Sequence, residues 1–265
     1  MIKRILLLVL LIFATPVALA AWNLGGGLES YQWQEYPQGS TGTPKESGPR
    51  AAFFANWTQE GIGPLFAWHA KVYGGTVNYD TFAMCNCASN GAPVSTQTEY
   101  RGVANEGQFF YRDDLGDYKL DYIGGLGLDT WRRRILNYGG DQIEDYSIFF
   151  ARAGVRLGKA RTEAGFHGEF GLKYPVSTNE DAHLYSAGYT TNPSLSPKGA
   201  ISGYAEFGYR INTRFDVVGY YDSWRFAQSA NVIANKPTDP PGSYWLIYQP
   251  KSNMDALGAK LLISF

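Results

Sequence analysis

The last nine residues, "LGAKLLISF" (257–265), place an apolar side chain at every second position. Counted back from the end, these are Phe265, Ile263, Leu261, Ala259 and Leu257, and Lys260 lies on the other face. A period of two is typical of a β-strand with one apolar face. The stretch therefore predicts that the chain ends inside a sheet, where a neighbouring strand must pair with it.

The same alternation recurs along the chain. In "PLFAWHAKVYGG" (64–75), Phe66, Trp68 and Val72 share one face, and His69 and Lys71 share the other. We predict about ten strands, an even number as in bacterial outer-membrane barrels. They cover residues 27–36, 48–59, 64–78, 95–112, 118–133, 145–158, 163–176, 199–212, 214–228 and 252–265.

The connections between these strands alternate in length. Those after the odd strands are long (37–47, 79–94, 134–144, 177–198 and 229–251), whereas those after the even strands are short, such as "EGIG" and "KART". Alternation alone also fits a soluble β-sandwich with its apolar face inward. Long loops on one side and tight turns on the other favour a membrane barrel. The predicted fold is an all-β, antiparallel, transmembrane up-and-down β-barrel with long outer loops, short periplasmic turns and lipid-facing apolar side chains.

The first residues and the composition agree with this fold. Lys3 and Arg4 precede an apolar run (5–13) and an Ala18-Leu19-Ala20 site, which together predict a signal peptide over 1–20 and a barrel domain over 21–265. No later stretch approaches a transmembrane helix. Tyr (19), Phe (15) and Trp (7) are frequent, as in strands that carry aromatic girdles. We predict a protein integral to the outer membrane.

The charge excludes one class of partner. The full chain has a net charge of −1, and without Lys3 and Arg4 the balance becomes 21 − 24, or −3. No basic surface for nucleic acid is expected. We expect contacts with outer-membrane lipid and lipopolysaccharide instead. The aromatic last residue, Phe265, resembles the C-terminal signature that the outer-membrane assembly machinery recognises, which makes that machinery a further expected partner.

Charged side chains on the polar faces should line the lumen. They form either a salt-bridged network that holds a narrow barrel rigid or the wall of a small polar channel. The predicted set is Arg50, His69, Lys71, Glu99, Arg101, Asp121, Asp129, Arg152, Arg156, His167, Glu169, Lys173, Glu206, Arg210, Asp222 and Lys260.

Two cysteines, Cys85 and Cys87, lie in the second long loop. In an oxidising compartment they favour a loop disulfide, although a functional thiol pair stays open. Their C-x-C spacing makes a small, strained ring, so the bond would be easily reduced. No further ligands at metal-binding spacing accompany them, and we expect neither a metal nor a cofactor.

The fourth long loop contains Asp181-x-His183. Here the chain resembles the omptin family of outer-membrane proteases, ten-stranded barrels with an Asp-x-His pair in the same ordinal loop. The resemblance implies that Asp181 and His183 activate a water molecule. An opposing Asp-x-Asp pair belongs in the second outer loop, where this chain has Asp80 and Cys85-Asn86-Cys87 instead. Only half of the catalytic site is carried over.

Other outer segments point to contact with ligands. The loop 231–250 carries Tyr244, Trp245 and Tyr248, either as a binding surface for an extracellular ligand or as an extension of the barrel wall. Consecutive arginines at the top of the fifth strand are suited to lipopolysaccharide phosphates, with a solvated rim as the alternative. They are Arg132, Arg133 and Arg134.

Three functions follow from these patterns. The first is a non-enzymatic role in surface interaction, envelope structure or limited passage of small solutes. The second is an omptin-like endopeptidase. The third is a narrow porin-like channel.

Overall fold

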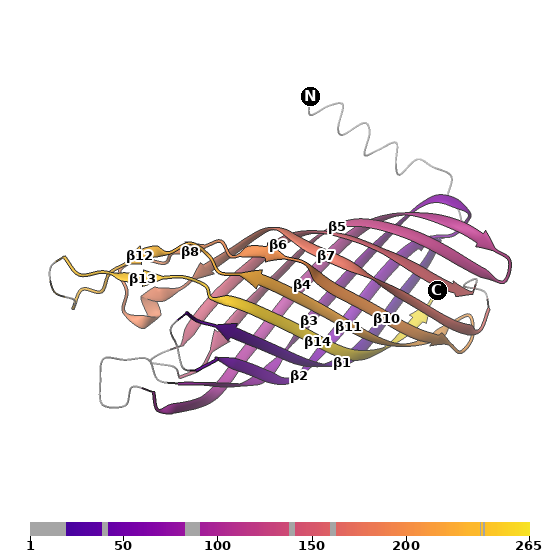
Figure 1. The fold of residues 1–265 in the computed structure, drawn as a ribbon. Helices are drawn as coiled ribbons and strands as arrows, with labels where there is room; N and C mark the ends of the chain where they lie inside the picture. The colour runs from indigo at the N-terminus through magenta and orange to yellow at the C-terminus, as the bar shows by residue number, and fades with distance from the viewer. Residues whose placement is uncertain are drawn as a thin grey trace, which may run out of the picture.

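The structure, a computed structural model, describes residues 20–38, 42–82, 91–137, 141–159, 163–238, 240 and 242–265. Ten long antiparallel strands close into one barrel, as predicted (Figure 1). The barrel strands are β1 (Ala20–Tyr36), β2 (Lys45–Gln59), β3 (Gly63–Phe82), β4 (Pro93–Leu115), β5 (Tyr118–Ile135), β6 (Gln142–Lys159), β7 (Gly165–Ala182), β10 (Ser202–Arg210), β11 (Phe215–Ala227) and β14 (Lys251–Ser264). No helix in the described ranges is long and apolar enough to cross a membrane.

The last strand closes the ring. β14 pairs with β11 on one side and with β1 on the other, so Lys260 lies opposite Gly27 and Val218. The N–H of Phe265 donates a hydrogen bond to the Trp22 carbonyl oxygen (2.9 Å). The terminal alternation therefore belongs to the strand that leaves the described barrel wall without a free edge.

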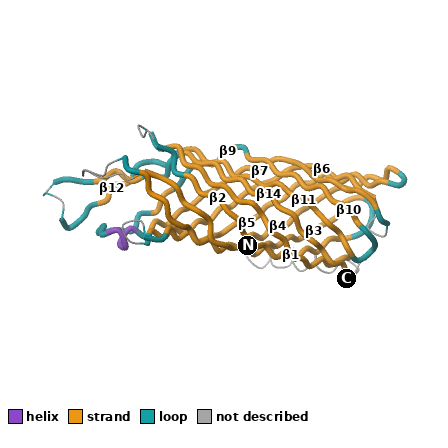
Figure 2. Tube along the Cα trace, turned by 90° about the horizontal axis from the view of Figure 1, so that it is seen from below, coloured by secondary structure: helices purple, strands orange, loops and turns teal. Residues whose placement is uncertain are grey.

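Short elements decorate one end of the barrel. They are the 3₁₀ turn η1 (Leu184–Ala187) and the strands β8 (Ser194–Leu195), β9 (Lys198–Ala200), β12 (Val232–Ala234) and β13 (Trp245–Ile247). β12 and β13 form a separate two-stranded ribbon that projects from the barrel end where the long loops gather (Figure 1). Figure 2 shows the short turns at the opposite end. The sorting of loops by length is confirmed.

The strands differ most clearly from the prediction in β1, in β7 and in the predicted eighth strand. β1 begins at Ala20, seven residues earlier than expected, because Trp22 and Leu24 continue the alternation before the Gly25–Gly27 run. β7 continues to Ala182, well into the predicted loop. The predicted eighth strand is interrupted between β9 and β10. Residues 1–19 of the predicted signal peptide lie outside the described residues.

Apolar side chains form a band around the outside of the barrel. Every barrel strand contributes to it, as shown by Leu28, Phe53, Val72, Val103, Leu126, Phe149, Leu172, Phe207, Val217 and Leu261, all exposed. On β4 to β7 the band ends toward the long loops at Val103, Leu128, Phe149 and Val176. The strands continue beyond it with polar outward side chains, so their outer parts lie outside the lipid-spanning segments.

Glycines on the inner face make room for aromatic rings. A Cβ added to Gly127 of β5 would lie 2.3 Å from the Phe150 ring of β6, and one added to Gly102 of β4 would lie 2.3 Å from the Tyr73 ring of β3. Both rings belong to the interior aromatic cluster. The missing side chain at each glycine therefore lets a large ring lie flat against the neighbouring strand.

Substituting Gly127 by alanine should force Phe150 out of its position and destabilise the barrel by about 1–3 kcal/mol, the usual cost of overpacking. The measurement is urea unfolding of the barrel refolded in detergent. Gly124→Ala is the matched control, because Gly124 faces outward on the same strand with nothing within 4 Å of the added Cβ. Equal stabilities of the two variants would contradict the packing role.

Candidate functional site

The lipid-spanning half of the lumen holds a first ion-pair network around Glu29 of β1. Its carboxylate accepts hydrogen bonds from Arg50 Nε (2.8 Å), Lys71 Nζ (2.6 Å) and the Tyr220 hydroxyl (2.8 Å). Glu29 and Arg50 are both buried. Charges withdrawn from bulk water need such partners, because an unpaired buried charge is strongly destabilising.

A second network lies nearer the short turns. Arg152 and Arg156 both bind Glu169, and Arg156 also reaches Asp121 (3.2 Å). Arg112 Nε donates to Asp121 as well (2.7 Å). Each carboxylate thus bridges two guanidinium groups, which links β4, β5, β6 and β7 across the interior.

The remaining charged lumen residues are paired too. His167 contacts Asp216 (2.9 Å), Lys260 binds Glu206 (2.7 Å) and Lys173 binds Asp222. Asp129 accepts hydrogen bonds from the Tyr73 hydroxyl and the Trp224 indole, and Arg210 lies 4.0 Å from Asp216. The imidazole of His69 lines two interior cavities. Fourteen of the sixteen predicted lumen residues therefore lie inside the barrel.

Glu99 and Arg101 do not, and for these two the prediction was wrong. Both lie on the outer face of β4, where the inward positions are Thr98, Tyr100 and Gly102. They follow the apolar band, beyond Val103. In that region the outer face of the strand is in contact with water, so a charged residue can point outward as well as into the lumen.

Two cavities of about 110 and 120 Å³ occupy the polar half of the lumen. One reaches Lys119 and Lys159 at the short-turn end, and the other lies beneath Phe150 and Trp224. The two share Asn56, His69, Glu206 and Lys260 as walls. Space for small molecules thus exists in the half of the lumen nearer the short turns.

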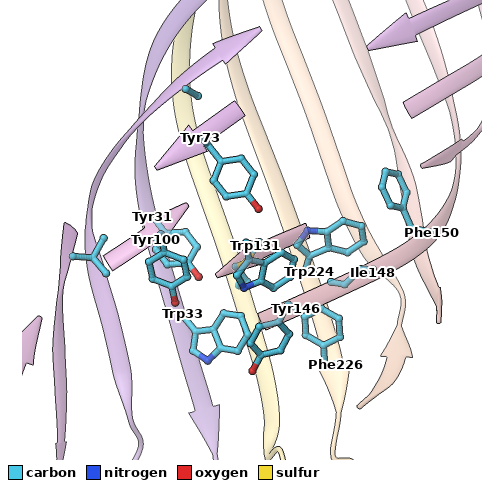
Figure 3. Packing of buried hydrophobic residues seen from close by; sticks show 13 residues of the cluster. Tyr31, Trp33, Tyr73, Tyr100, Trp131, Tyr146, Ile148, Phe150, Trp224 and Phe226 are labelled. Carbon is cyan, nitrogen blue, oxygen red and sulfur yellow. The ribbon is translucent and has the colours of Figure 1, made fainter. Parts of the chain in front are cut away.

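Beside these cavities, buried aromatic rings from several strands pack against one another inside the barrel (Figure 3). Trp33 of β1 and Tyr146 of β6 have ring centroids 5.6 Å apart, although β6 is five strands from β1 in either direction around the ring of ten. Trp33 also contacts Trp131 and Phe226 at 6.4 Å. Rings from opposite walls touch, and Trp33, Trp131, Tyr146 and Phe226 are all buried, so this level of the lumen is filled by aromatic side chains.

On the far side of the rings lies a chamber of buried carboxylates around Arg133. Its guanidinium binds Glu35 (2.9 Å), Glu46 (2.8 Å) and Glu144 (2.7 Å). Arg133 is 1% exposed, which corrects its prediction as a surface contact for lipopolysaccharide. Alternation turns the middle arginine of the three inward. These glutamates were not among the predicted lumen residues. Glu46 and Glu144 lie just before the predicted strands 48–59 and 145–158, and Glu35 lies at the end of the predicted strand 27–36.

Arg132 and Arg134 do lie on the outer face of β5. Arg132 binds Asp145 through two hydrogen bonds (2.7 and 2.8 Å), and Arg134 binds Asp141 and Glu99. The Arg132 guanidinium, followed by the His183 contact, holds the pKa of Asp145 below its usual range. In the same way, Arg134 lowers the pKa of Asp141.

The structure does not bring Asp181 and His183 together. The His183 ring contacts Asp145 (2.9 Å), whereas Asp181 is exposed and accepts a hydrogen bond from Asn179 (3.2 Å). Both lie on the outer face because the β6–β7 register shifts between Phe149 and Phe150. A bulge of this kind moves all later side chains to the opposite face. Without it, Asp181 would face the lumen.

The projecting ribbon carries exposed apolar side chains, Ile233, Tyr244, Trp245 and Leu246. Tyr189 lies edge-on to Trp245 at 6.4 Å, with Lys236 over its face at 4.4 Å. Thr190 N–H donates to the Asn235 carbonyl (2.8 Å) and joins the fourth and fifth outer loops. Tyr248 is half-buried at the base. The prediction for Cys85 and Cys87 lies outside the described residues.

No protein-family model matches this chain, and no curated protein matches it. Among solved structures, the outer-membrane protease OmpT of Escherichia coli superposes with a TM-score of 0.52 at 13% identity, covering 93% of this chain and 96% of that chain. The transport unit of the autotransporter AIDA-I from Escherichia coli gives 0.45 at 9% identity, with 96% and 94% covered. OprG of Pseudomonas aeruginosa gives 0.36 at 10%, with 94% and 97% covered.

At such identities the likeness is one of fold. The chain is a closed, ten-stranded antiparallel barrel of the outer-membrane type, with a barrel plan similar to that of OmpT. This fold supports an outer-membrane location.

Proposed function

We propose that this protein is a closed outer-membrane barrel that acts through its surface, as a non-enzymatic interaction protein. The contact of Trp33 with Tyr146 across the lumen carries this proposal, because it argues against a conducting pore. The omptin-like alternative lacks support in the geometry, since His183 pairs with Asp145 on the outer face and not with Asp181. The exposed apolar ribbon β12–β13 then supplies the surface for contact.

Purified protein in planar bilayers should show no stepwise conductance. The double variant Trp33→Ala, Tyr146→Ala should conduct, because removal of both rings opens a water-filled gap between opposite walls. Trp22→Ala, which removes a lipid-facing ring on the same strand as Trp33, should stay closed. Stepwise conductance of the unaltered protein would favour the porin-like alternative.

The ribbon is suited to burying apolar surface against a partner. Large apolar side chains gathered on an exposed surface mark interaction sites more often than chance. Ile233 and Leu246 are cross-strand neighbours in the ribbon and both are exposed. Beside Trp245 lies the Tyr189 ring, and the Lys236 ammonium group lies over that ring.

Cells that display the protein should aggregate or adhere more than cells without it, and Trp245→Ser with Leu246→Ser should lower this several-fold. The control is Asp117→Asn in the short β4–β5 turn at the other end of the barrel. Surface amounts of both variants are compared by labelling of intact cells. Unchanged adhesion at equal surface amounts would refute the role of the ribbon.

We also propose that the outer face contacts lipopolysaccharide. The register places Arg101, Arg132, Asp145 and Asp181 in one row across β4 to β7, just beyond the apolar band. Arg101 is exposed, and half of the Arg132 side chain is exposed although it binds Asp145. Guanidinium groups at this height are suited to the phosphates of the outer leaflet. Recognition of Phe265 by the assembly machinery stays a prediction.

Lipopolysaccharide added to the detergent-refolded barrel should raise its melting temperature. Arg101→Ala with Arg132→Ala should remove most of that rise, since two phosphate ligands are lost. Arg225→Ala is the control, because Arg225 lies on β11, outside the row, and binds Asp255. An equal rise for the double variant and the control would contradict the phosphate contact.

A further inference from the structure

The chamber beyond the aromatic rings is short of positive charge. Four glutamates, Glu35, Glu46, Glu144 and Glu180, are all at most 8% exposed there. Among the described residues, Arg133 is the cation that forms ion pairs with them, and Glu180 forms none. With every group ionised the chamber would hold three uncompensated negative charges. Burial of uncompensated charge is costly enough that such a group takes up a proton instead.

Three of the carboxylates are well supplied with donors. Trp33 Nε1 donates to Glu35 (3.0 Å), the Tyr100 hydroxyl donates to Glu46, and Gln142 Nε2 donates to Glu144 (2.7 Å). Each of the three also forms an ion pair with Arg133, although burial raises the pKa of Glu46 as well.

Glu180 differs from these three. It is 1% exposed, and its Oε2 atom has no hydrogen-bond partner in the described part of the chain. The Thr178 hydroxyl, on the same inward face of β7, has none either. Glu180 lies opposite Tyr146 in the register, which makes Glu144 its diagonal neighbour on β6. The Glu180 carboxyl group has a hydrogen bond with Tyr146, but it forms no ion pair with Arg133 and its Oε2 atom has no donor.

Glu180 lies beyond the apolar band, four residues after Val176. Burial, followed by the charge of Glu144, raises its pKa well above the usual range. The titratable and charged groups of the chamber are Glu35, Glu46, Tyr79, Tyr100, Arg133, Glu144, Tyr146 and Glu180. Of these, the Tyr146 hydroxyl, through a hydrogen bond, and Arg133, through its positive charge, oppose that shift.

We propose that the chamber is a proton-binding site, in which Glu180 carries a proton while the outer lumen is closed and loses it as the external pH rises. The proton removes the repulsion between Glu180 and the carboxylates of Glu144 and Glu35. Loss of the proton places a further negative charge directly beside Tyr146, one of the two rings that close the lumen. Alkaline pH therefore loosens the closure, and acidic pH tightens it.

The sign follows from linkage. A carboxyl whose pKa is raised by folding binds more protons in the folded than in the unfolded state, so stability falls as pH rises above the ordinary carboxyl value. The fall continues until the pH passes the pKa of the folded state. For one proton, the unfolding equilibrium constant increases about tenfold per pH unit within this window.

The experiment is urea unfolding of the detergent-refolded full barrel, from about pH 5 to about pH 9, for the unaltered protein and for Glu180→Gln. In both proteins the unfolding equilibrium constant is followed as the pH rises. In the unaltered protein it should increase more steeply than in Glu180→Gln, by a further factor of up to about ten per pH unit. Glu99→Gln, on the outer face of β4, should retain the full dependence. Equal pH dependence in Glu180→Gln and the unaltered protein would overturn the proposal.

Two further measurements keep the proposal testable if Glu180→Gln folds poorly. Glu144→Gln should weaken the same pH dependence, because Glu180 then loses its like-charged neighbour. Bilayer conductance of the unaltered protein should appear at alkaline pH and be absent in Glu180→Gln. A barrel that stays closed across the whole range would show that the proton does not control closure, without bearing on binding at the ribbon.

Discussion

The backbone of a chain in lipid must satisfy its own hydrogen bonds, and this requirement shapes the rest of the molecule. In strands it is met when the sheet closes, which β14 achieves by pairing with both β11 and β1. A ring of ten strands is narrow, so side chains from opposite walls meet inside it. The contact between Trp33 and Tyr146, the paired charges and the small cavities all follow from that narrow lumen.

Within the lipid-spanning part, the sequence predicted the orientation of side chains well. Lipid on one side forces apolar residues outward, so charged residues such as Arg152, Glu169 and Lys260 could only point inward. Beyond the apolar band that constraint ends, since water lies on both sides of the wall. Arg101 faces outward and Arg133 inward, and the residue type gives no hint of either.

A single backbone irregularity links the site that was expected with the one that was found. The extra residue at the β6–β7 bulge turns Asp181 to the outer face and Glu180 to the lumen. The acid–base pair implied by the omptin resemblance is thereby turned to the outer face, and a glutamate without an ion pair enters the chamber. Our two proposals, a surface-acting barrel and a buried proton site, both rest on this irregularity.

By itself the sequence determined the strands, the direction of their apolar faces, the long loops at one end and the closing role of the last strand. These properties can be derived from short stretches of sequence, because an alternation with a period of two involves only residues that are close together in the chain. Only the tertiary structure decided which side chains meet. Arg133 contacts Glu46 and Glu35, which lie 87 and 98 residues away, and Trp33 meets Tyr146 across the barrel. Such contacts depend on the register of every strand between the two residues and on the bulge. A periodic sequence pattern contains no information about either.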